Sequence, residues 1–358
     1  MAAAPFVCAR RLEIAYGNKT GSQVLLLSFP SEGWMQVLEI YGKRNLAWTY
    51  KIPKTTKQPA SPNDQTTNSM KIGAILVLYN PDVARTRKVV ELLLPQVDAI
   101  CAIDNSDNGI AEITFEGKAN VDYISLGGNY GIAKAQNVGI RHFKEAGFDF
   151  ILFIDQDTMP EKDTVSRLLT SWQCLDKEGI KVGAVAPIGI NHFTNKTISY
   201  SIAKIRNLNI DDHRFLEVIH TMSSMSLINL KMFDEVGMMW EQLFIDAVDC
   251  EWCWRAADKV GARFFYDYDI KMNHILGIGS KTVGKRSIHI TPPYRMYYQY
   301  RNFIWLLRKK YVPRRWLRKN GVKYVLKIGY YVIGGPDRLA YIKNIARGIR
   351  DGIRGDRS

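Results

Sequence analysis

Five apolar segments that alternate with amphipathic ones restrict residues 72 to 188 to one class of fold. The apolar segments, at 72–79, 97–104, 121–126, 148–155 and 182–188, predict buried strands. Helices are expected from Pro81 to Leu94, in the segment IAKAQNVGIRHFKEA after the turn GGNYG, and after Pro160. Apolar strands joined by helices are typical of a mostly parallel sheet with helices on both faces. We therefore predict an α/β fold.

A polar linker at residues 59–69 precedes the first of these strands. Residues 1–58 contain short apolar runs such as QVLLLSF without a clear period, whereas the regular alternation begins at Met70 with MKIGAILVLYNP. We predict three parts: an N-terminal extension and linker at 1–69 that is dispensable for function, a main domain at 70–290, and a basic, aromatic, helical region at 291–358.

Positive charge is concentrated at the C-terminal end of the chain. From Arg301 onward 16 Lys and Arg stand against three Asp, so this tail carries +13 of the net charge of +14. A localised basic tail indicates an anionic partner, either phospholipid headgroups or nucleic acid. The sequence contains no apolar run of 18 residues and does not begin like a secretory signal. The expected location is therefore the cytoplasm.

The five cysteines are too few and too unevenly spaced to indicate a disulfide framework. Cys250 and Cys253 form a CxxC pair, but no second pair follows that would complete a zinc site. We expect both to be packing residues of a helix.

Two carboxylates follow the fourth apolar segment, where ILFIDQDT (151–158) places Asp155 and Asp157. Ligands of such folds bind beyond the carboxyl ends of the strands, and this rule brings Tyr79 and Asp104 to the same edge. Alternate residues of an extended chain point to one side, so the pair favours a divalent cation that relieves the repulsion between the carboxylates. The alternative is that Asp155 caps the strand and Asp157 caps the following helix.

Several blocks resemble, in order and spacing, the nucleotide-sugar-binding half of family 2 glycosyltransferases: VLYNP (77–81), IDNSDNG (103–109), LGGNYGIAKAQNVGI (126–140) and FIDQDTMP (153–160). LFIDAVDCEWCWRA (243–256) is similar to the acceptor-side block of that family, and MNHILGIGS followed by YRMYYQYRN (272–302) to its closing section. FIDQDT together with FIDAVDCEW most resembles bacterial rhamnosyltransferases. The resemblance covers about residues 71–302 and implies a nucleotide-diphospho-sugar transferase fold of the GT-A type, followed here by a basic helical tail.

One position departs from the family pattern. Ser224, Met225 and Ser226 stand where the family has Ser-Gly before SLI. A side chain in place of that glycine bears on the shape of the acceptor pocket.

The resemblance implies a set of donor-binding residues. Asp104 would bind the base of the nucleotide, and Tyr79 would line the base pocket. Asn129, Gly131 and Asn137 would shape the turn and the helix beside the donor. For these three residues, a glycine turn with Asn129 as a helix cap is the alternative.

The resemblance also implies a divalent cation, Mg²⁺ or Mn²⁺, that neutralises the charge of the departing diphosphate. Asp157 would ligate this metal, and Asp155 would approach the ribose or the metal. His274 would lie near the metal and the diphosphate, with a hydrogen-bonded surface histidine as the alternative.

Transfer with inversion requires a base that removes the proton of the acceptor hydroxyl. Asp249 matches the base position of the family, with Asp246 and Glu251 as neighbours on the acceptor side. Acids at these positions also suit the first turn of a helix, and Glu251 with Arg255 forms an i,i+4 pair of a structural kind. Arg301 matches the closing RN of the family and would reach phosphate.

The tail segment RLAYIKNIARGIRDGIRG predicts a helix with one apolar and one basic stripe, formed by Ile342, Ile345, Ile349 and Ile353 and by Lys343, Arg347, Arg350 and Arg354. This pattern is typical of a helix that lies in a membrane interface. A helix packed on the catalytic domain with a solvated basic edge fits the pattern equally. Acceptors of the family are commonly lipid-linked glycans at the cytoplasmic membrane face, which favours peripheral attachment to the inner membrane.

The resemblance implies an inverting enzyme that moves L-rhamnose from dTDP-L-rhamnose to a lipid-linked glycan in the biosynthesis of a bacterial O-antigen or capsule. No residue identifies the sugar, so another nucleotide sugar is an alternative. A protein without catalysis that binds nucleic acid or membrane through the tail, with aromatic side chains at Tyr297, Tyr298, Tyr300, Trp305 and Trp316, would leave the carboxylates unexplained. A sensor that has lost catalysis would not need Asp155, Asp157 and Asp249 together. No nucleic-acid partner is expected.

Overall fold

The computed structural model describes residues 11–15, 23–28, 34–40, 47–53, 70–107, 115, 118–191, 196–197, 203–274, 280–283, 286–289, 292–333 and 337–355. The chain divides between Ser69 and Met70 into two compact units. The smaller unit contains an antiparallel sheet in the order β1-β2-β3-β4, formed by β1 (Arg11–Ala15), β2 (Gln23–Ser28), β3 (Trp34–Ile40) and β4 (Ala47–Pro53). The irregular apolar pattern of this segment did not predict a sheet.

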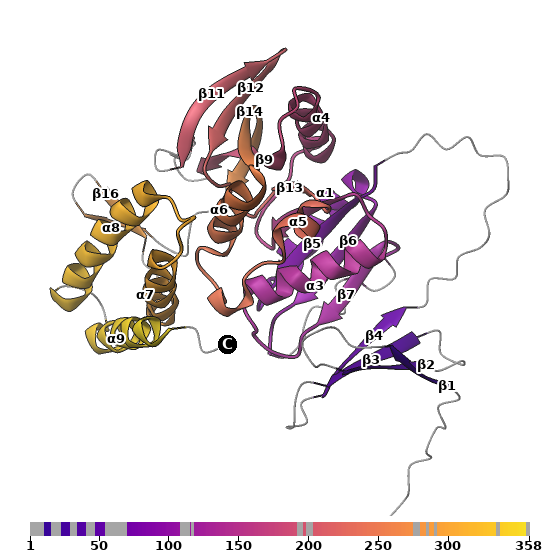
Figure 1. Cartoon of the computed structure of the whole chain (residues 1–358), viewed down its shortest axis with the longest axis horizontal. Coiled ribbons are helices and arrows are strands. Elements are labelled where there is room, and N and C mark those ends of the chain that lie inside the picture. Colours follow the sequence, from indigo (N-terminus) through magenta and orange to yellow (C-terminus); the bar gives the residue numbers. More distant parts are fainter. Residues whose placement is uncertain are drawn as a thin grey trace, which may run out of the picture. The chain divides into compact units, whose positions relative to one another are not determined.

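The larger unit is built on a sheet of ten described strands (Figure 1). One half is parallel in the order β7-β6-β5-β8, formed by β5 (Ile72–Leu78), β6 (Ala99–Asp104), β7 (Val121–Ser125) and β8 (Phe150–Asp155). These strands and β9 (Val182–Asn191) confirm the five that were predicted from the apolar segments.

The other half of the sheet is mixed. The short strand β13 (Leu227–Asn229) lies antiparallel between β8 and β9, and β14 (Arg263–His274) runs parallel to β9. The hairpin of β11 (Lys204–Ile210) and β12 (His213–Val218) extends the sheet beyond β14, while β10 (Lys196–Thr197) pairs with β9. The complete sheet is therefore mixed, with its parallel part where the apolar segments predicted it.

Helices cover both faces of the sheet. On one face α3 (Ile132–Glu145), α5 (Met232–Val236) and α6 (Val248–Val260) pack in a core that includes Ile75. On the other face α1 (Val83–Leu93) and α4 (Thr164–Lys177) pack in a core that includes Leu76. Adjacent residues of β5 point to opposite faces, as the pleat requires. Gly139 lets α3 approach closely, because a Cβ there would lie 2.6 Å from Ile75.

Three helices follow the sheet: α7 (Pro293–Leu307), α8 (Arg314–Ile333) and α9 (Arg338–Arg354) (Figure 1). A small antiparallel pair, β15 (Ser280–Val283) and β16 (Arg286–His289), precedes them. Helix α9 packs along α7, where Gly352 leaves no space for a side chain beside Ile304. Ile345 is buried and Ile349 is partly buried in this contact, whereas Ile342 and Ile353 are 40% and 61% exposed. The apolar stripe predicted on α9 therefore lies partly against the protein itself.

Aromatic side chains join these helices to the rest of the larger unit. Trp316 of α8 lies edge-on to Trp254 of α6 at 4.8 Å between ring centroids. Tyr300, Trp305 and Trp316 are buried, so they do not form the open stacking surface that single-stranded nucleic acid requires. Within the described residues, no helix combines the length and apolar character needed to cross a membrane.

Candidate active site

The carboxyl ends of three neighbouring parallel strands bring the predicted donor-side residues to one edge of the sheet. Leu78 of β5 pairs with Asp104 of β6, and Val77 pairs with Asp155 of β8. Tyr79, Asp104 and Asp155 therefore leave their strands at the same level.

Gln156, the residue between the two aspartates, holds the main chain at Tyr79. Its Oε1 accepts a hydrogen bond from Tyr79 N at 2.8 Å, and its Nε2 donates to Tyr79 O at 3.1 Å. The next residue, Asn80, has a left-handed φ of 43° and donates its N–H to Ser106 Oγ at 2.8 Å. The Tyr79 side chain is 42% exposed, so its ring is accessible while its main chain is fixed.

Asp104 lies beneath this edge with no exposed surface. One carboxylate oxygen accepts from Ser106 N at 2.9 Å and the other from Tyr123 OH at 2.7 Å. Asp104 therefore fixes the turn that follows β6, and the contact with the nucleotide base that the resemblance implies stays a prediction.

Asn129 and Gly131 form the turn before α3. Asn129 Oδ1 accepts from Asn105 Nδ2 and from Gly131 N, both at 3.1 Å. Gly131 has a φ of 87°, and a Cβ there would lie 2.6 Å from the main-chain oxygen of Phe244. Ile132 N donates to that same oxygen at 2.8 Å. Gly131 is required by this close approach, which joins the turn to the acceptor-side block.

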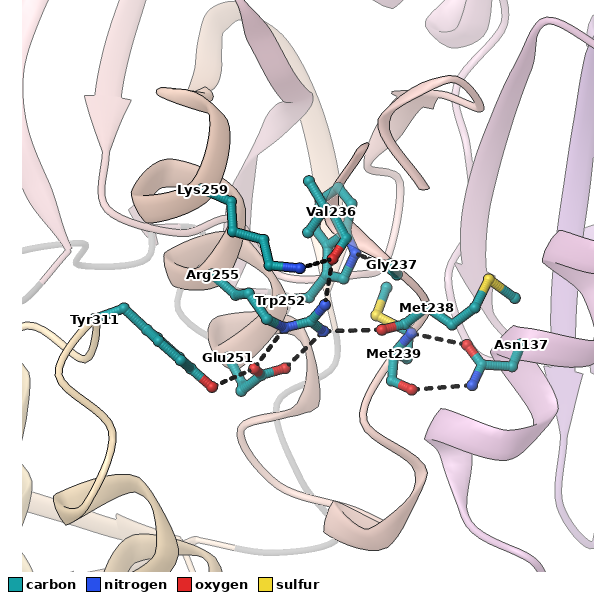
Figure 2. A network of polar contacts seen from close by, with 10 residues as sticks. All are labelled: Asn137, Val236, Gly237, Met238, Met239, Glu251, Trp252, Arg255, Lys259 and Tyr311. Atoms are coloured by element: carbon teal, nitrogen blue, oxygen red, sulfur yellow. Dashed lines mark hydrogen bonds and ion pairs between the residues drawn. The ribbon is translucent and has the colours of Figure 1, made fainter. Parts of the chain in front are cut away.

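Asn137 is buried in α3, and its amide is hydrogen-bonded to the segment that precedes α6 (Figure 2). Its Nδ2 donates to Met239 O at 3.0 Å and to Glu241 Oε1 at 2.9 Å, and its Oδ1 accepts from Met239 N at 2.9 Å. These hydrogen bonds fix the segment against α3, and the donor-side role of Asn137 stays a prediction.

A cavity of about 280 Å³ brings the two halves of the predicted site together. Asp155 from the end of β8, Asp249 from α6 and Arg295 from α7 all line it. The other lining residues are Ile132, Gln136, Met222, Ser223, Ser224, Ile245, Asp246, Ala247 and Val248. The predicted base thus shares one cavity with a predicted donor-side carboxylate.

Asp155 sits in an electrostatically unfavourable position in this cavity. Burial raises the pKa of Asp155 to about 7, and the carboxylates of Asp157 and Asp249 add to the rise, whereas Ser224 and Arg295 lower it. Asp155 N donates to Ser224 Oγ at 3.2 Å. Close to neutral pH the site therefore favours either a proton or a cation at Asp155.

Asp249 is the second residue of α6, and its Oδ1 accepts from Cys250 N at 2.8 Å. The two residues before the helix, Asp246 and Ala247, have left-handed φ angles of 67° and 64°. Ala247 occupies the N-cap position, so Asp246 does not cap the helix. It instead forms an ion pair with Arg295, at 3.0 Å between Oδ1 and Nη2. Asp246 and Ala247 turn the chain directly before α6, and the first turn of this helix places Asp249 in the cavity lining.

Glu251 and Arg255 form a buried clamp away from the cavity (Figure 2). Arg255 donates through Nε and Nη2 to the two Glu251 oxygens at 2.8 and 3.0 Å. Tyr311 OH donates to Glu251 Oε1 at 2.7 Å, and Arg255 also donates to the main-chain oxygens of Val236 and Met238. The pair joins α6 to α5 and to Tyr311 in the connection between α7 and α8.

Met225 adopts a left-handed φ of 60°, a conformation that favours glycine. Its side chain is fully buried in the core around Leu152 and does not line the cavity. Its neighbours Ser223 and Ser224 do line it. The Met225 side chain, which stands where the family has glycine, therefore packs in the core and does not change the lining of the cavity.

The structure places Arg301 among main-chain oxygens and aromatic rings, and its contact with phosphate stays a prediction. It is buried, donates through Nη2 to Leu243 O at 3.1 Å, and lies 4.3 Å from the ring of Trp305. These contacts brace the 3₁₀ turn η2 (Glu241–Leu243). His274 ends β14, and its side chain lies outside the described residues.

Asp155 and Asp157 remain as candidate metal ligands. Among the described residues, no group of three or more His, Cys, Asp and Glu gathers as a metal site made by the protein alone would require. Mg²⁺ and Mn²⁺ need only one or two carboxylates when substrate phosphates complete the coordination. Because Asp157 raises the pKa of Asp155, a cation between them would relieve their repulsion. The pair fits a metal that binds together with a phosphorylated ligand.

Sequence reasoning missed Gln156, Ser224 and Arg295 as parts of the site. Gln156 stands between the two aspartates and Arg295 lies in the block YRMYYQYRN, so both were inside recognised segments. Their contacts join residues 77 and 49 positions apart, respectively, which no local period reveals. Cys250 and Cys253 lie in α6 without a disulfide, in agreement with the packing role expected for them.

A family model and curated relatives match this chain. Residues 74–237 match the family model described as glycosyl transferase family 2. The chain is 33% identical over 297 residues to dTDP-rhamnosyl transferase RfbF of Shigella flexneri, which covers 79% of this chain and 96% of that protein. It is 26% identical over 148 residues to the low-salt glycan biosynthesis hexosyltransferase Agl10 of Haloferax volcanii, covering 38% of this chain and 46% of that protein. Among solved structures, S. aureus TarS is similar with a TM-score of 0.48 and 16% identity, over 79% of this chain and 49% of that chain.

Proposed function

We propose, because the chain belongs to glycosyl transferase family 2, that it transfers L-rhamnose from dTDP-L-rhamnose to a glycan acceptor with inversion at the anomeric carbon. The chain is a glycosyltransferase with a GT-A type of sheet. The observation that supports this reaction is the shared cavity, in which Asp249 of the acceptor side faces the same space as Asp155 of the donor side.

The chemistry follows from these two sides. The oxygen of an acceptor hydroxyl forms a bond to the anomeric carbon of the sugar while the bond from that carbon to the diphosphate oxygen breaks. Asp249 takes the proton of the hydroxyl, and the nucleoside diphosphate leaves with the bonding electrons. The buried clamp of Glu251 and Arg255 supports this step by fixing α6.

A divalent cation, Mg²⁺ or Mn²⁺, would be held by Asp157 and Asp155, with His274 as a further candidate ligand. When bound, it supplies positive charge that stabilises the departing diphosphate. Asp155 would lie nearer to the ribose, while Tyr79 and the turn fixed by Asp104 would receive the base.

Rhamnose as the sugar is supported by the extent of the similarity to RfbF, which spans nearly the whole of that protein. We extend the proposal to a lipid-linked glycan of a bacterial surface polysaccharide, an O-antigen or a capsule, as the acceptor. Ser223 lines the cavity and would offer its hydroxyl group to a sugar acceptor.

Contact with an anionic membrane surface is supported by helix α8. Its side chains Val322, Val325 and Leu326 are 63%, 69% and 66% exposed and follow the i, i+3, i+4 spacing of one helix face. Arg318, Lys319 and Lys323 are exposed beside them. An exposed apolar stripe flanked by basic residues suits the interface of a membrane that contains anionic lipid. We therefore assign peripheral attachment at the cytoplasmic face to α8, with the basic edge of α9 in support.

A donor panel tests the function. Purified protein is incubated with dTDP-L-rhamnose, dTDP-glucose, UDP-glucose or GDP-mannose and a lipid-linked glycan acceptor, and release of the nucleoside diphosphate is measured. We expect acceptor-dependent release from dTDP-L-rhamnose above all others. Preference for another nucleotide sugar would replace rhamnose, and the same assay on residues 70–358 tests whether residues 1–69 are dispensable.

A further inference from the structure

We propose that Arg295 binds the diphosphate of the donor and of the nucleotide product, and that Asp246 positions it. This inference rests on the proposed function, because it assigns a protein cation to the same cavity. Arg295 lies in the first turn of α7 and lines the cavity together with Asp155 and Asp249.

The charge balance of the cavity favours such a cation. Among the described residues that line it, Asp155, Asp246 and Asp249 contribute carboxylates and Arg295 contributes a guanidinium. A nucleoside diphosphate adds further negative charge when it enters. Arg295 and Asp155 line the same cavity, so a diphosphate beside the donor-side carboxylate also lies beside the guanidinium.

The geometry of Arg295 leaves part of its guanidinium available. Its Nε donates to Asp246 Oδ2 at 3.0 Å, and its Nη2 donates to Asp246 Oδ1 at 3.0 Å. Within the part of the chain that the structure describes, Nη1 makes no hydrogen bond. The planar guanidinium carries five N–H groups and can bind a carboxylate on one edge and a phosphate on another. Asp246 therefore orients Arg295 without consuming all of its donors.

The neighbouring cations are less suited to this role. Arg301 is buried among main-chain oxygens and aromatic rings. Lys327 of α8 donates to Gln299 Oε1 at 3.0 Å, and burial with the nearby Lys323 lowers its pKa to about 8. Neither side chain lines the cavity. Arg301, which matches the family motif, binds main-chain oxygens. Arg295, six residues before it in the sequence, lines the cavity.

Binding of dTDP and of thymidine to the full chain, measured by calorimetry with a chelator present, tests this role. The chelator removes any metal contribution, so the remaining preference for dTDP reports on protein cations. Arg295→Gln alone would leave Asp246 without a partner, so we compare Asp246→Asn with the double variant Asp246→Asn/Arg295→Gln, in which both charges are absent. Arg308→Gln at the other end of α7 is the matched control.

We expect wild type and Arg308→Gln to show the same preference for dTDP over thymidine, and Asp246→Asn to keep only part of it, because the arginine remains but loses the carboxylate that orients it. The double variant should lose about tenfold or more of this preference while its affinity for thymidine stays unchanged. A double variant that keeps the full preference would overturn the role of Arg295 and leave the proposed function intact. Equal loss of dTDP and thymidine affinity would also overturn it, because the effect would then not concern the diphosphate. Wild type that binds neither compound, even when Mn²⁺ replaces the chelator, would contradict the proposed function itself.

Discussion

The side-chain amide of Gln156 brackets the main chain of Tyr79, accepting from its N–H at 2.8 Å and donating to its carbonyl oxygen at 3.1 Å. This pair of hydrogen bonds joins the segment after β8 to the segment after β5. The residue between the two aspartates therefore fixes the loop that presents the proposed base-pocket side chain.

Gln156→Glu should weaken donor binding without slowing the chemical step. A glutamate still accepts from Tyr79 N, but its carboxylate cannot donate to Tyr79 O. The loss of one hydrogen bond, about 0.5 to 1.5 kcal/mol, corresponds to an increase of roughly two- to tenfold in the Kd for thymidine, which lacks the diphosphate that the new carboxylate would repel. Calorimetry measures this Kd, and Gln173→Glu on α4 is the control. An unchanged Kd, or the same change in the control, would show that the bracket does not shape the base pocket.

Asp155 should make the ligand-free protein less stable as pH rises from about 4 to about 7. Its pKa is raised from 3.8 to about 7, so between these values the folded protein holds a proton that the unfolded chain has released. One pKa unit corresponds to about 1.36 kcal/mol. Because Asp155→Asn carries no charge to bury, its free energy of unfolding at pH 8 should exceed that of wild type by at least about 1 kcal/mol. The advantage should disappear near pH 4. Urea unfolding at both pH values measures the difference, and equal stability at pH 8 would argue against the raised pKa.

The same ionisation predicts how metal binding responds to pH. The ionised form of Asp155 is the proposed ligand, so the affinity for Mn²⁺ in the presence of dTDP should increase between about pH 6 and pH 8. Titration calorimetry detects the increase, and Asp157→Asn should abolish metal binding at both pH values. A metal affinity that does not vary with pH would remove Asp155 from the coordination.

Val325→Asp should weaken binding of the protein to anionic vesicles by about tenfold or more, because the burial of one valine side chain contributes about 1.5 to 3 kcal/mol. Val325 is 69% exposed on α8, and Ile205, which is 51% exposed on β11, supplies the control Ile205→Asp. Flotation with phosphatidylglycerol vesicles at low and high salt measures the effect. Binding of wild type should also fall as salt rises. Equal flotation of both variants would exclude the α8 face as the contact.

Met225→Gly should destabilise the fold even though it removes a left-handed methionine. Relief of the backbone conformation is worth roughly 1 kcal/mol, whereas the loss of a fully buried methionine side chain costs about 2 to 5 kcal/mol. The free energy of unfolding should therefore fall by about 1 to 4 kcal/mol, with KM for the acceptor unchanged because Met225 does not line the cavity. Met225→Leu keeps the volume and serves as the control. A more stable glycine variant would show that strain outweighs packing at this position.

The parallel half of the fold was predictable because three of its four strands are buried on both faces. β5, β6 and β8 read as continuous apolar runs, and parallel pairing then places Tyr79, Asp104 and Asp155 on one edge without further information. The strand β13 has only three residues and takes its place between β8 and β9 through antiparallel pairing. So short a segment carries no period, and its position depends on tertiary contacts alone.

The position of the acidic residues of the site was predictable from the sequence motifs. The carboxylates of Asp155 and Asp249 lie in one cavity, as the motifs implied when they were taken together. Arginines were less predictable, since Arg295 and Arg301 lie on the same helix and differ only in what surrounds them. Arg301 is buried against Trp305, whereas Arg295 pairs with Asp246. Both contacts arise only in the folded chain.

Turnover by Asp249→Asn tests the central claim most directly, since Asp249 is the proposed base. The measurement is acceptor-dependent release of dTDP from dTDP-L-rhamnose, with the Kd for dTDP determined on the same samples and Asp258→Asn on the exposed side of α6 as control. We predict a fall in kcat of about 100-fold or more for Asp249→Asn, an unchanged Kd, and full activity in the control. An Asp249→Asn variant that turns over at the rate of wild type would contradict the account.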